Sequence, residues 1–434
     1  MKTYTYNSLN KQEVEALCKR PKMDFSEVSE QVRPILDDVK ASGDEAVRSW
    51  TKKFDGVDPD PILVDPTNIE INLTPGIKNA IDRAMSNIFR FHREQLTHPI
   101  EVETESGVVC SRIAKPIERV GLYIPGGTAP LPSTAMMLGV PALIAGCKTI
   151  VMATPPDKKG NLPDSVVYVA QKLGIKHLLK AGGAQAIAAM AFGTETVPKV
   201  DKLFGPGNQY VTAAKMILQN SDAMVSIDMP AGPSEVLVIA DETADPEFVA
   251  VDLLSQAEHG SDSQAILVAT QNADIKAIQR HLEIQLDELP RKEFASEAIS
   301  KSFILIVDDS EAAMEFSNRY APEHLIINTK DADELAEKVI NAGSVFIGPW
   351  TPESMGDYAS GTNHTLPTYG YARMYSGVSL HSFQKFITMQ KISEEGLKNL
   401  GPAVETLADL EGLDAHRNAV RLRLKKLEER GQVR

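Results

Sequence analysis

From about residue 120 onward, short runs of β-branched and other apolar residues alternate with alanine-rich segments of helical periodicity. The runs predict strands at 149–153, 177–179, 202–204, 235–240, 265–269, 303–307, 325–327 and 344–347. Between several of them, segments 248–258, 273–288 and 331–341 predict helices. This alternation is typical of parallel sheets covered by helices on both faces. So many strands indicate two sheets, with the cleft between them as the natural place for a site.

The two ends of the chain have a different pattern. Residues 1–100 are predicted to be mostly helical, and segment 79–96 repeats apolar residues at three- and four-residue spacing. Near the other end, apolar residues again follow helical spacing before a charged run; they are Leu407, Leu410, Leu413, Val420, Leu424 and Leu427. The 434 residues are enough for two or three compact units. We therefore predict an α/β protein with small helical segments at both termini.

Charge and cysteine content exclude several classes of function. The formal net charge is −14, and no basic patch precedes the C-terminal helix, so a nucleic-acid partner is not expected. The longest apolar stretch, 134–147, contains Pro141 and is too short to span a bilayer, and the N-terminus has no apolar secretion signal. Cys18, Cys110 and Cys147 have no paired spacing, which fits a reducing cytoplasm. We expect an acidic, soluble, cytoplasmic protein.

Three glycine-rich segments adjoin predicted strands: GLYIPGG at 121–127, AGGAQ at 181–185 and FGPGN at 204–208. Glycine lets backbone N–H groups approach a ligand closely, as in loops that hold phosphate groups. None of the segments completes G-x-G-x-x-G, because Tyr210 stands where the third glycine would fall. Nucleotide binding and ordinary tight turns both stay open.

The segment Gln256-Ala-Glu258-His259-Gly260 is a candidate metal site. Gln256 and His259 are three residues apart on a predicted helix that Gly260 would end, so their side chains would point the same way. Glutamine is an uncommon zinc ligand, and the spacing alone favours a polar cluster at a helix end over a metal site.

Pro322-Glu323-His324 precedes a predicted strand and sets a carboxylate beside an imidazole. Such a pair can divide acid and base duties when the environment separates the two pKa values. Both side chains can reach one substrate only from the loop before the strand, since consecutive strand residues point to opposite faces. A solvated loop pair is the alternative.

Two further segments carry polar residues of interest. Segment 354–368, rich in Gly, Ser and Thr, contains Asp357 and His364 and reads as a loop that could cover an active site. His416 falls on the apolar stripe of the terminal helix, where a packed core histidine is the common case. Glu411 lies roughly 140° away around that helix, so one rigid helix could aim both residues at one point only with a break at Gly412.

Eight sequence strings occur in order along the chain: GLYIPGGTAPLPST, AGGAQAIAAMAFGTE, VPKVDKLFGPGNQYV, DMPAGPSEVLVIAD, LLSQAEHGSDSQ, APEHL, ESMGDYASGTNHTLPT and AHRNAV. Taken together, they resemble histidinol dehydrogenase over essentially the whole chain. Segment 156–163 looks like an inserted surface loop. The resemblance implies histidine biosynthesis: oxidation of L-histidinol through L-histidinaldehyde to L-histidine, with reduction of two NAD+.

The resemblance also implies roles for individual residues, all at matching positions. The implied ligands of one zinc ion per subunit are Gln256, His259, Asp357 and His416, with the substrate's imidazole nitrogen and amino group completing the coordination. The implied acid–base residues are Glu323 and His324. Implied substrate contacts are Ser234, Glu411 and His324, besides the metal ligands. Implied NAD contacts are Tyr123, Gln185 and Asn208, which lie in the three glycine-rich segments.

The fold implied by the resemblance has two incomplete Rossmann-like, doubly wound domains. Residues 26–122 and 236–378 would form the first, with the metal and catalytic residues, and residues 123–235 the second, with the NAD-binding segments. Residues 1–25 would be a helical N-terminal segment. Residues 379–434 would be a helical segment that crosses to the partner in a homodimer and completes the partner subunit's site, which would relieve the geometric difficulty with Glu411 and His416.

This chemistry agrees with the residue types. His324, which titrates near neutral pH, suits removal of the alcohol proton, and Glu323 suits activation of the water that hydrates the aldehyde. Zinc would mainly orient the substrate by chelation. A cysteine thiohemiacetal is disfavoured, because Cys147 lies among apolar residues and Cys110 has no activating neighbour in sequence.

Three alternatives stay open. A relative on the same scaffold could oxidise another small amino- or sulfo-substituted alcohol, for which Glu411 and His416 would be dispensable. A zinc hydrolase could use Glu323 to activate water, although hydrolysis needs no cofactor segments. A non-catalytic binding protein would tolerate loss of both Glu323 and His324. Preference for NAD over NADP follows only from the family.

Overall fold

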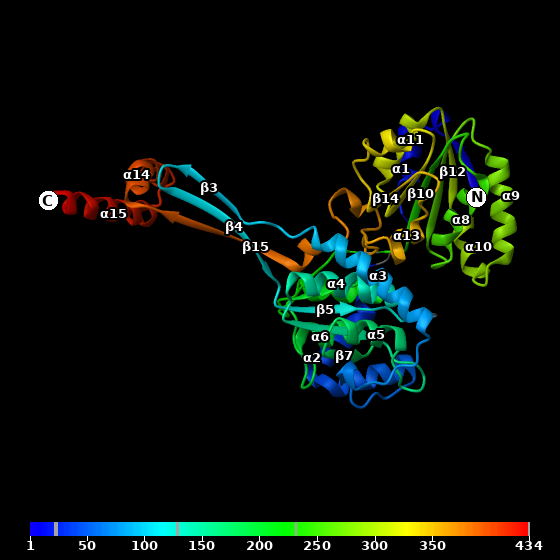
Figure 1. Ribbon diagram of the computed structural model, residues 1–434, viewed down its shortest axis with the longest axis horizontal. Coiled ribbons are helices and arrows are strands. Elements are labelled where there is room, and N and C mark those ends of the chain that lie inside the picture. Colours follow the sequence, from blue (N-terminus) through cyan, green and yellow to red (C-terminus); the bar gives the residue numbers. More distant parts are fainter. Residues whose placement is uncertain (21–24, 127–129, 231, 433–434) are drawn as a thin grey trace. The chain divides into compact units, whose positions relative to one another are not determined.

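The computed structural model describes residues 1–20, 25–126, 130–230 and 232–432, which form two compact units (Figure 1). The first unit contains Met1–Gln95 and Ile117–Phe383, and the second contains Leu96–Pro116 and Gln384–Arg434. No helix among the described residues is long and apolar enough to cross a membrane.

One six-stranded sheet of the first unit has the order β2-β7-β6-β5-β8-β9. Its strands are β2 (Leu63–Val64), β5 (Arg119–Tyr123), β6 (Thr149–Thr154), β7 (His177–Lys180), β8 (Lys202–Phe204) and β9 (Ser226–Ile227). All neighbours are parallel except β2 and β7. The chain runs outward from β5 to β6 and β7 and then returns to β8. The strand order therefore reverses between β5 and β8, the place where doubly wound sheets bind ligands.

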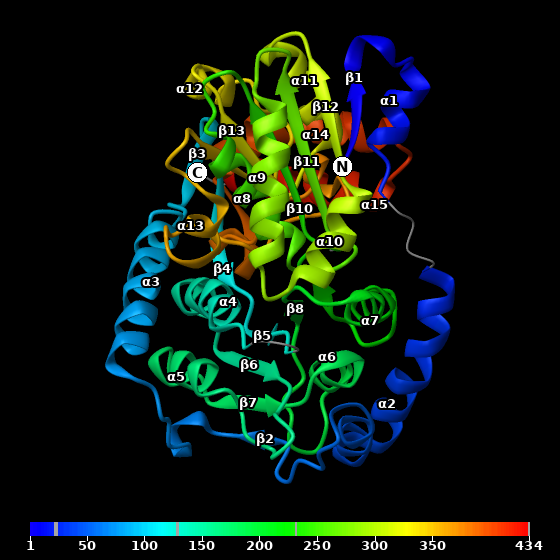
Figure 2. The same cartoon turned by 90° about the vertical axis from the view of Figure 1, so that its right-hand side faces the viewer.

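Helices cover both faces of this sheet. Apolar residues of α3 (Pro75–Arg93), α4 (Pro132–Ala145) and α5 (Asp164–Lys172) share one core with the sheet. Residues of α2 (Phe25–Asp55), α6 (Gly183–Phe192) and α7 (Gln209–Gln219) share the other. Figure 2 shows α4 and α5 on one side of β5, β6 and β7, and α6 on the other.

A second six-stranded sheet is parallel throughout, with the order β1-β12-β11-β10-β13-β14. Its strands are β1 (Lys2–Thr5), β10 (Glu235–Ala240), β11 (Gln264–Thr270), β12 (Phe303–Val307), β13 (His324–Asn328) and β14 (Ser344–Ile347). One face packs on α8 (Pro246–Ala257), α9 (Ile275–Glu288) and α10 (Lys292–Lys301). The other packs on α1 (Lys11–Leu17), α11 (Ser310–Tyr320) and α12 (Ala332–Ala336). Short helices follow later: α13 (Glu353–Tyr358) and the 3₁₀ turns η3 (Tyr371–Arg373) and η4 (Leu380–Phe383), in addition to η1 (Tyr6–Ser8) and η2 (Pro66–Asn68).

The predicted α/β class is confirmed, and every strand predicted from the alternating runs is present. The loop 156–163 connects β6 to α5, and its residues Asp157 to Lys159 are exposed.

The packing divides the chain differently from the expected domain boundaries. Helices α2 and α3, expected with residues 236–378, pack on the sheet of β5 to β8 because their apolar faces match its two sides. Within the N-terminal segment that was expected to be helical, Lys2–Thr5 instead forms the edge strand β1 beside β12.

The second unit is not purely helical. It contains an antiparallel sheet in the order β15-β4-β3, built from β3 (Ile100–Glu105), β4 (Val108–Pro116) and β15 (Gln384–Ile392). Two helices follow, α14 (Glu394–Leu410) and α15 (Asp414–Gln432), and they pack on each other. At Gly401, a Cβ would lie only 3.0 Å from Leu424 Cδ1 and 3.1 Å from Val420 Cγ1. The terminal segment is not one rigid helix: α14 ends at Leu410 and α15 begins at Asp414, and Gly412 between them has φ of +69°.

Candidate active site

Glu323 and His324, the residues expected to act as acid and base, lie at the amino end of β13. Glu323 directly precedes the strand and His324 is its first residue, and both side chains are buried. The backbone N–H of Glu235, the first residue of β10, donates to Glu323 Oε2 over 2.8 Å. His324 Nδ1 lies 3.0 Å from the carbonyl oxygen of Glu235 and 3.5 Å from Glu323 Oε2. The structure thus makes these residues a fixed, buried pair rather than a solvated loop.

The contacts of His324 indicate its tautomer. A carbonyl oxygen can only accept, so Nδ1 carries a proton and donates to Glu235. Nε2 lies 3.2 Å from Asp357 Oδ1, on α13. Nε2 is therefore the nitrogen that faces the other candidate site residues.

Electrostatics couple these groups. Burial opposes a charge on His324, but the carboxylates of Glu323 and Asp357 outweigh it and raise the pKa of the imidazole. Burial raises the pKa of Glu323, against the effect of His324. Burial also opposes ionisation of Asp357, yet its contact with His324 holds the pKa of that carboxyl below its usual value. Asp357 is consequently ionised at neutral pH.

Gln256 occupies the last turn of α8 and is buried. Its Nε2 donates to Glu353 Oε1 over 2.9 Å, while its Oε1 has no hydrogen-bond partner among the described residues. Glu353 Oε1 also accepts from Ser255 Oγ over 2.5 Å, and burial raises the pKa of Glu353 to about 8. An amide oxygen held in this way, buried and without a donor, is suited to bind a cation.

His259 does not lie on the helix as predicted. Helix α8 ends at Ala257 and Glu258 caps it, so Gly260 is not the residue that ends it. The His259 side chain is exposed, yet the atoms around it desolvate the imidazole enough to lower its pKa, against the effect of the nearby Asp357. His259 is therefore neutral at pH 7, which is the form that binds metals.

Other site residues are distributed over both units. Ser234 directly precedes Glu235 and is half-buried. In the second unit, Glu411 caps the C-terminal end of α14 and His416 lies in the first turns of α15, and both are exposed. Within the described residues, no three His, Cys, Asp or Glu side chains gather into a group that could hold a metal ion.

The predicted cofactor residues lie at or beyond the carboxyl ends of β5, β7 and β8. Tyr123 ends β5; its hydroxyl accepts from Gly183 N over 3.0 Å, and burial raises its pKa to about 12. Gln185 is buried in α6, and its Oε1 has no partner in the described part of the chain. Asn208 caps α7 by accepting from the backbone N–H groups of the next helical turn. Residues 127–129, at and just after the end of the glycine-rich segment 121–127, lie outside the described residues.

The loop after β8 is held close to β5. Gly205 has φ of +123°, and a Cβ at this position would lie 2.1 Å from the carbonyl oxygen of Tyr123. Only glycine allows this approach. The segments that follow β5 and β8 therefore meet where the strand order reverses, as expected for a nucleotide-binding sheet.

Two residues that hold the site together, Glu353 and His364, could not be given this role from the sequence. Glu353 orients the amide of Gln256, as described above. His364 is half-buried; its Nδ1 donates to the carbonyl oxygen of Asp357 over 2.8 Å, and its Nε2 lies 3.1 Å from Thr134 Oγ1 on α4. Thr134 is 230 positions from His364, and Glu353 is 97 positions from Gln256, so only the fold reveals these contacts.

Cys147 and Cys18 are poorly suited to act as nucleophiles. The Cys147 thiol lies 4.0 Å from the carbonyl oxygen of Phe383, and burial raises its pKa to about 12, so it is protonated at neutral pH. Burial also raises the pKa of Cys18. None of the three cysteines forms a disulfide within the described structure.

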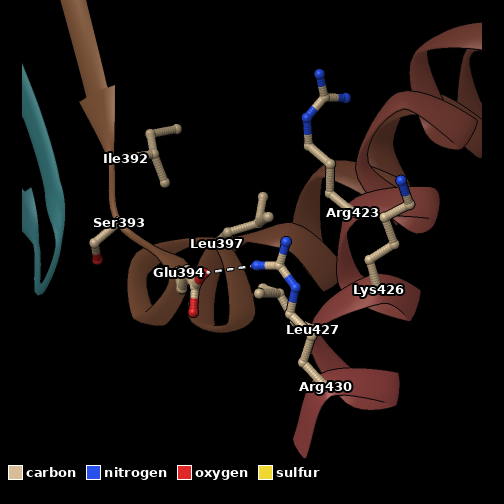
Figure 3. A pocket seen from close by; sticks show the side chains of 8 residues that line it. All are labelled: Ile392, Ser393, Glu394, Leu397, Arg423, Lys426, Leu427 and Arg430. Carbon is tan, nitrogen blue, oxygen red and sulfur yellow. Dashed lines mark hydrogen bonds and ion pairs between the residues drawn. The ribbon is translucent and has the colours of Figure 1, made fainter.

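A cavity of about 390 Å³ lies in the second unit, between the start of α14 and α15 (Figure 3). It is lined by Ile392, Ser393, Glu394, Leu397, Arg423, Lys426, Leu427 and Arg430. Glu394 and Arg430 form an ion pair across it at 3.3 Å. None of the predicted site residues lines this cavity.

Comparisons with known proteins agree on one family. The family model described as histidinol dehydrogenase matches residues 18–424. A chloroplastic histidinol dehydrogenase of Arabidopsis thaliana is 59% identical over 430 residues, which cover 99% of this chain and 92% of that protein. The histidinol dehydrogenase of Schizosaccharomyces pombe is 53% identical and covers 97% of each chain. The crystal structure of histidinol dehydrogenase from Elizabethkingia anophelis superposes with a TM-score of 0.94 at 50% identity, covering 99% of each chain.

Proposed function

The chain belongs to the histidinol dehydrogenase family of oxidoreductases, which acts in histidine biosynthesis, and from this premise we propose that it oxidises L-histidinol in two NAD-dependent steps. The first step gives L-histidinaldehyde and the second gives L-histidine. The observation that carries this proposal is the buried Glu323–His324 pair, fixed by the backbone of Glu235 and facing Asp357.

Gln256, His259 and Asp357, with His416 of the partner subunit, would hold one zinc ion. The donor set supports this: an unpartnered buried amide oxygen, a neutral imidazole and an ionised carboxylate. When bound, zinc would supply orientation, by chelating the imidazole nitrogen and amino group of the substrate.

In the first oxidation, His324 acts as the general base. Its Nδ1 is engaged by Glu235, so Nε2 is the nitrogen that accepts the proton of the substrate hydroxyl. Glu323 and Asp357 raise the pKa of this imidazole, so the role requires that Asp357 act as a metal ligand, since a metal-bound carboxylate would no longer hold a proton on Nε2. As the oxygen–hydrogen bond breaks, the carbon–hydrogen bond delivers a hydride to NAD+, and an aldehyde and NADH result. The remaining proposed contacts of the substrate are Ser234 of the same chain and Glu411 of the partner subunit.

In the second oxidation, Glu323 takes a proton from water while the water oxygen bonds to the aldehyde carbon, and the carbonyl oxygen takes the proton that His324 gained in the first oxidation. The resulting hydrate loses a hydride to a second NAD+, and His324 again accepts a hydroxyl proton, which leaves the carboxylic acid. The raised pKa of Glu323 makes it a stronger base than an exposed carboxylate.

The cofactor would bind across the carboxyl ends of β5 and β8, against Tyr123, Gln185 and Asn208. The close approach of Gly205 to Tyr123 and the N-terminus of α7 support this position. Selection of NAD over NADP is inherited from the family in this proposal.

We further propose a homodimer in which residues 379–434 complete the site of the partner. The second unit exposes apolar side chains that a partner would cover: Leu407 is 60% exposed and Leu410 is 83% exposed. Glu411 and His416 lie beside these residues and are also exposed. The reaction would take place in the cytoplasm, which suits three unpaired cysteines.

The first test is the stoichiometry of NADH formation from L-histidinol, with metal-loaded and chelator-treated protein. We expect two NADH per histidinol, loss of activity on chelation, and recovery with Zn²⁺. One NADH with released aldehyde would contradict the role of Glu323. Family membership removes the hydrolase and the non-catalytic alternatives. Reduction of NAD+ with another amino or sulfo alcohol, but not with histidinol, would instead identify a relative with a different substrate.

The loop after β8 gives a second prediction. Lys215 Nζ donates to the carbonyl oxygen of Gly205 over 2.9 Å, and Asp228 Oδ2 accepts from Gly205 N over 2.8 Å. Lys215 and Asp228 form a buried ion pair. Because Lys215→Met leaves a buried charge unpaired and releases the loop, we expect KM for NAD+ to rise by about tenfold, with a smaller change in kcat.

Lys172→Met is the matched control. It removes an exposed ion pair between Lys172 on α5 and Asp82 on α3, two helices that cover the same sheet. We expect it to change neither constant. An unchanged KM for NAD+ in Lys215→Met, despite a lower Tm, would contradict the assignment of this loop to the cofactor.

A further inference from the structure

The backbone of Glu235 holds both members of the acid–base pair. Its N–H donates to Glu323 Oε2 over 2.8 Å and its carbonyl oxygen accepts from His324 Nδ1 over 3.0 Å. A shift of this one residue would therefore displace both side chains together. What fixes Glu235 also fixes the geometry of the pair.

The side chain of Glu235 is fixed by Arg20. Arg20 Nε donates to Oε1 over 2.9 Å and Nη2 donates to Oε2 over 2.8 Å, and the side chains are only 5% and 2% exposed. The guanidinium also lies 3.5 Å from the centre of the Tyr320 ring. Two parallel hydrogen bonds to one carboxylate, combined with stacking on an aromatic ring, require the planar guanidinium group of arginine.

The other N–H groups of Arg20 reach the turn before the acid–base pair. Nη1 donates to the carbonyl oxygens of Cys18 and Tyr320, over 2.9 and 2.8 Å, and Nη2 donates to that of Ala321 over 3.3 Å. All five donors of the guanidinium are thus used. Arg20 joins the N-terminal segment, the end of α11 and the start of β10.

Two strained residues lie in this network. Ala321, which is two residues before Glu323, has φ of +55°, and Tyr369 has φ of +56°. Tyr369 N donates to Glu235 Oε1 over 3.0 Å, while Ala321 is held by Arg20 as described. Strained backbone of this kind persists only where several contacts fix it.

We propose that Arg20 is a positioning residue for the reaction: through its ion pair with Glu235 and its bonds to Tyr320 and Ala321, it holds Glu323 and His324 in their working positions. This inference rests on the proposed function for its kinetic part. Arg20 touches neither the pair nor the proposed metal ligands in any described contact, so its loss alters the placement of the pair rather than its chemistry.

The test compares Arg20→Met and Arg20→Lys with wild type, at saturating histidinol and at saturating histidinaldehyde, per folded active site. Since both oxidations depend on the pair, we expect kcat for both substrates to fall by about 10- to 100-fold in Arg20→Met, with KM for either substrate and for NAD+ within about twofold. Arg20→Lys keeps the positive charge but lacks the planar guanidinium with its five donors, so we expect a kcat between those of wild type and Arg20→Met. Arg119→Met is the control, because Arg119 pairs with Asp201 in an exposed ion pair (46% and 37% exposed) away from the site.

A second measurement does not depend on activity. The backbone N–H of Glu235 is protected by its hydrogen bond to Glu323, and Arg20 holds Glu235 in the position that allows this bond. Amide hydrogen exchange at Glu235 should therefore accelerate in both Arg20 variants, while exchange in β5 stays unchanged. Normal exchange at Glu235, or a lower Tm with unchanged kcat per folded site, would overturn the proposal. Wild type that fails to oxidise histidinol would refute the proposed function instead, and the exchange experiment would still decide the positioning role. If Arg20→Met does not fold, Arg20→Lys carries both measurements.

Discussion

Replacing Glu323 by glutamine is expected to stop the reaction after one oxidation. An amide cannot take a proton from water, so hydration of the aldehyde should slow by about 100-fold or more, the usual contribution of a general base. The first hydride transfer should stay within about tenfold of wild type, because it depends on His324. The glutamine oxygen can still accept from Glu235 N, so the local structure is preserved.

Single-turnover formation of NADH, with quenched samples analysed for aldehyde, measures this effect. We expect one NADH to form rapidly and the second slowly, with bound histidinaldehyde between them. His324→Gln should slow both steps and serves as the comparison, whereas Glu315→Gln, an exposed carboxylate on α11, should slow neither. Two NADH formed at the wild-type rate would remove Glu323 from the mechanism.

The second large effect concerns the second unit. Deletion of the chain from Gly401 onward is expected to abolish activity, because it removes Glu411 and His416. Deletion alone does not tell whether these residues act within their own chain. Co-expression of Glu323→Gln with His416→Asn, assayed by the steady-state formation of histidine, separates the two cases. Each variant alone should form little histidine, but half of the dimers would be heterodimers with one intact site.

If the tail completes the partner's site, activity should return to about one quarter of wild type in the mixed population. A matched pair, Glu323→Gln with Asp357→Asn, alters the same unit in both chains, so no intact site can form and no activity should return. Absence of recovery in the first mixture, with heterodimers demonstrated by tagged purification, would place Glu411 and His416 outside a shared site.

Most of the strands that could be predicted are buried on both faces. Glu235–Ala240 and Gln264–Thr270 are nearly continuous apolar runs because helices cover both sides of their sheet. Three strands with exposed faces, β1, β3 and β15, gave no such run. Lys2–Thr5 is mostly exposed at a sheet edge, and β3 and β15 are mostly exposed on a sheet of only three strands.

The site was predictable to a different degree. Single motifs such as Gln256 with His259 were ambiguous, and the helix that should have carried both ends before the histidine. The order of all motifs indicated the family, and hence the roles of these residues. The residues that support the site could not be found in this way. Arg20 and Glu235 are 215 positions apart, and Glu353 is 97 positions from Gln256, so no local pattern joins them.

The location of the acid–base pair also departs from the usual pattern. Ligand sites of doubly wound sheets lie at the carboxyl ends of the strands, as the glycine-rich segments do. Glu323 and His324 instead lie at the amino end of β13, beside the amino end of β10. Sequence periodicity gives the strand but not which of its ends is used.

The second unit is built from two stretches that are far apart in the chain, so its parts are synthesised at different times. Strand β4 leaves the ribosome early, but its partner β15 is made only after all of the first unit. Domains commonly fold as they emerge, so the first unit can fold while β4 still lacks one neighbour. A nascent chain released before β15 therefore presents β4 with one unpaired edge, open to pairing with another chain, and quality control in the cell would meet that edge before any catalytic defect.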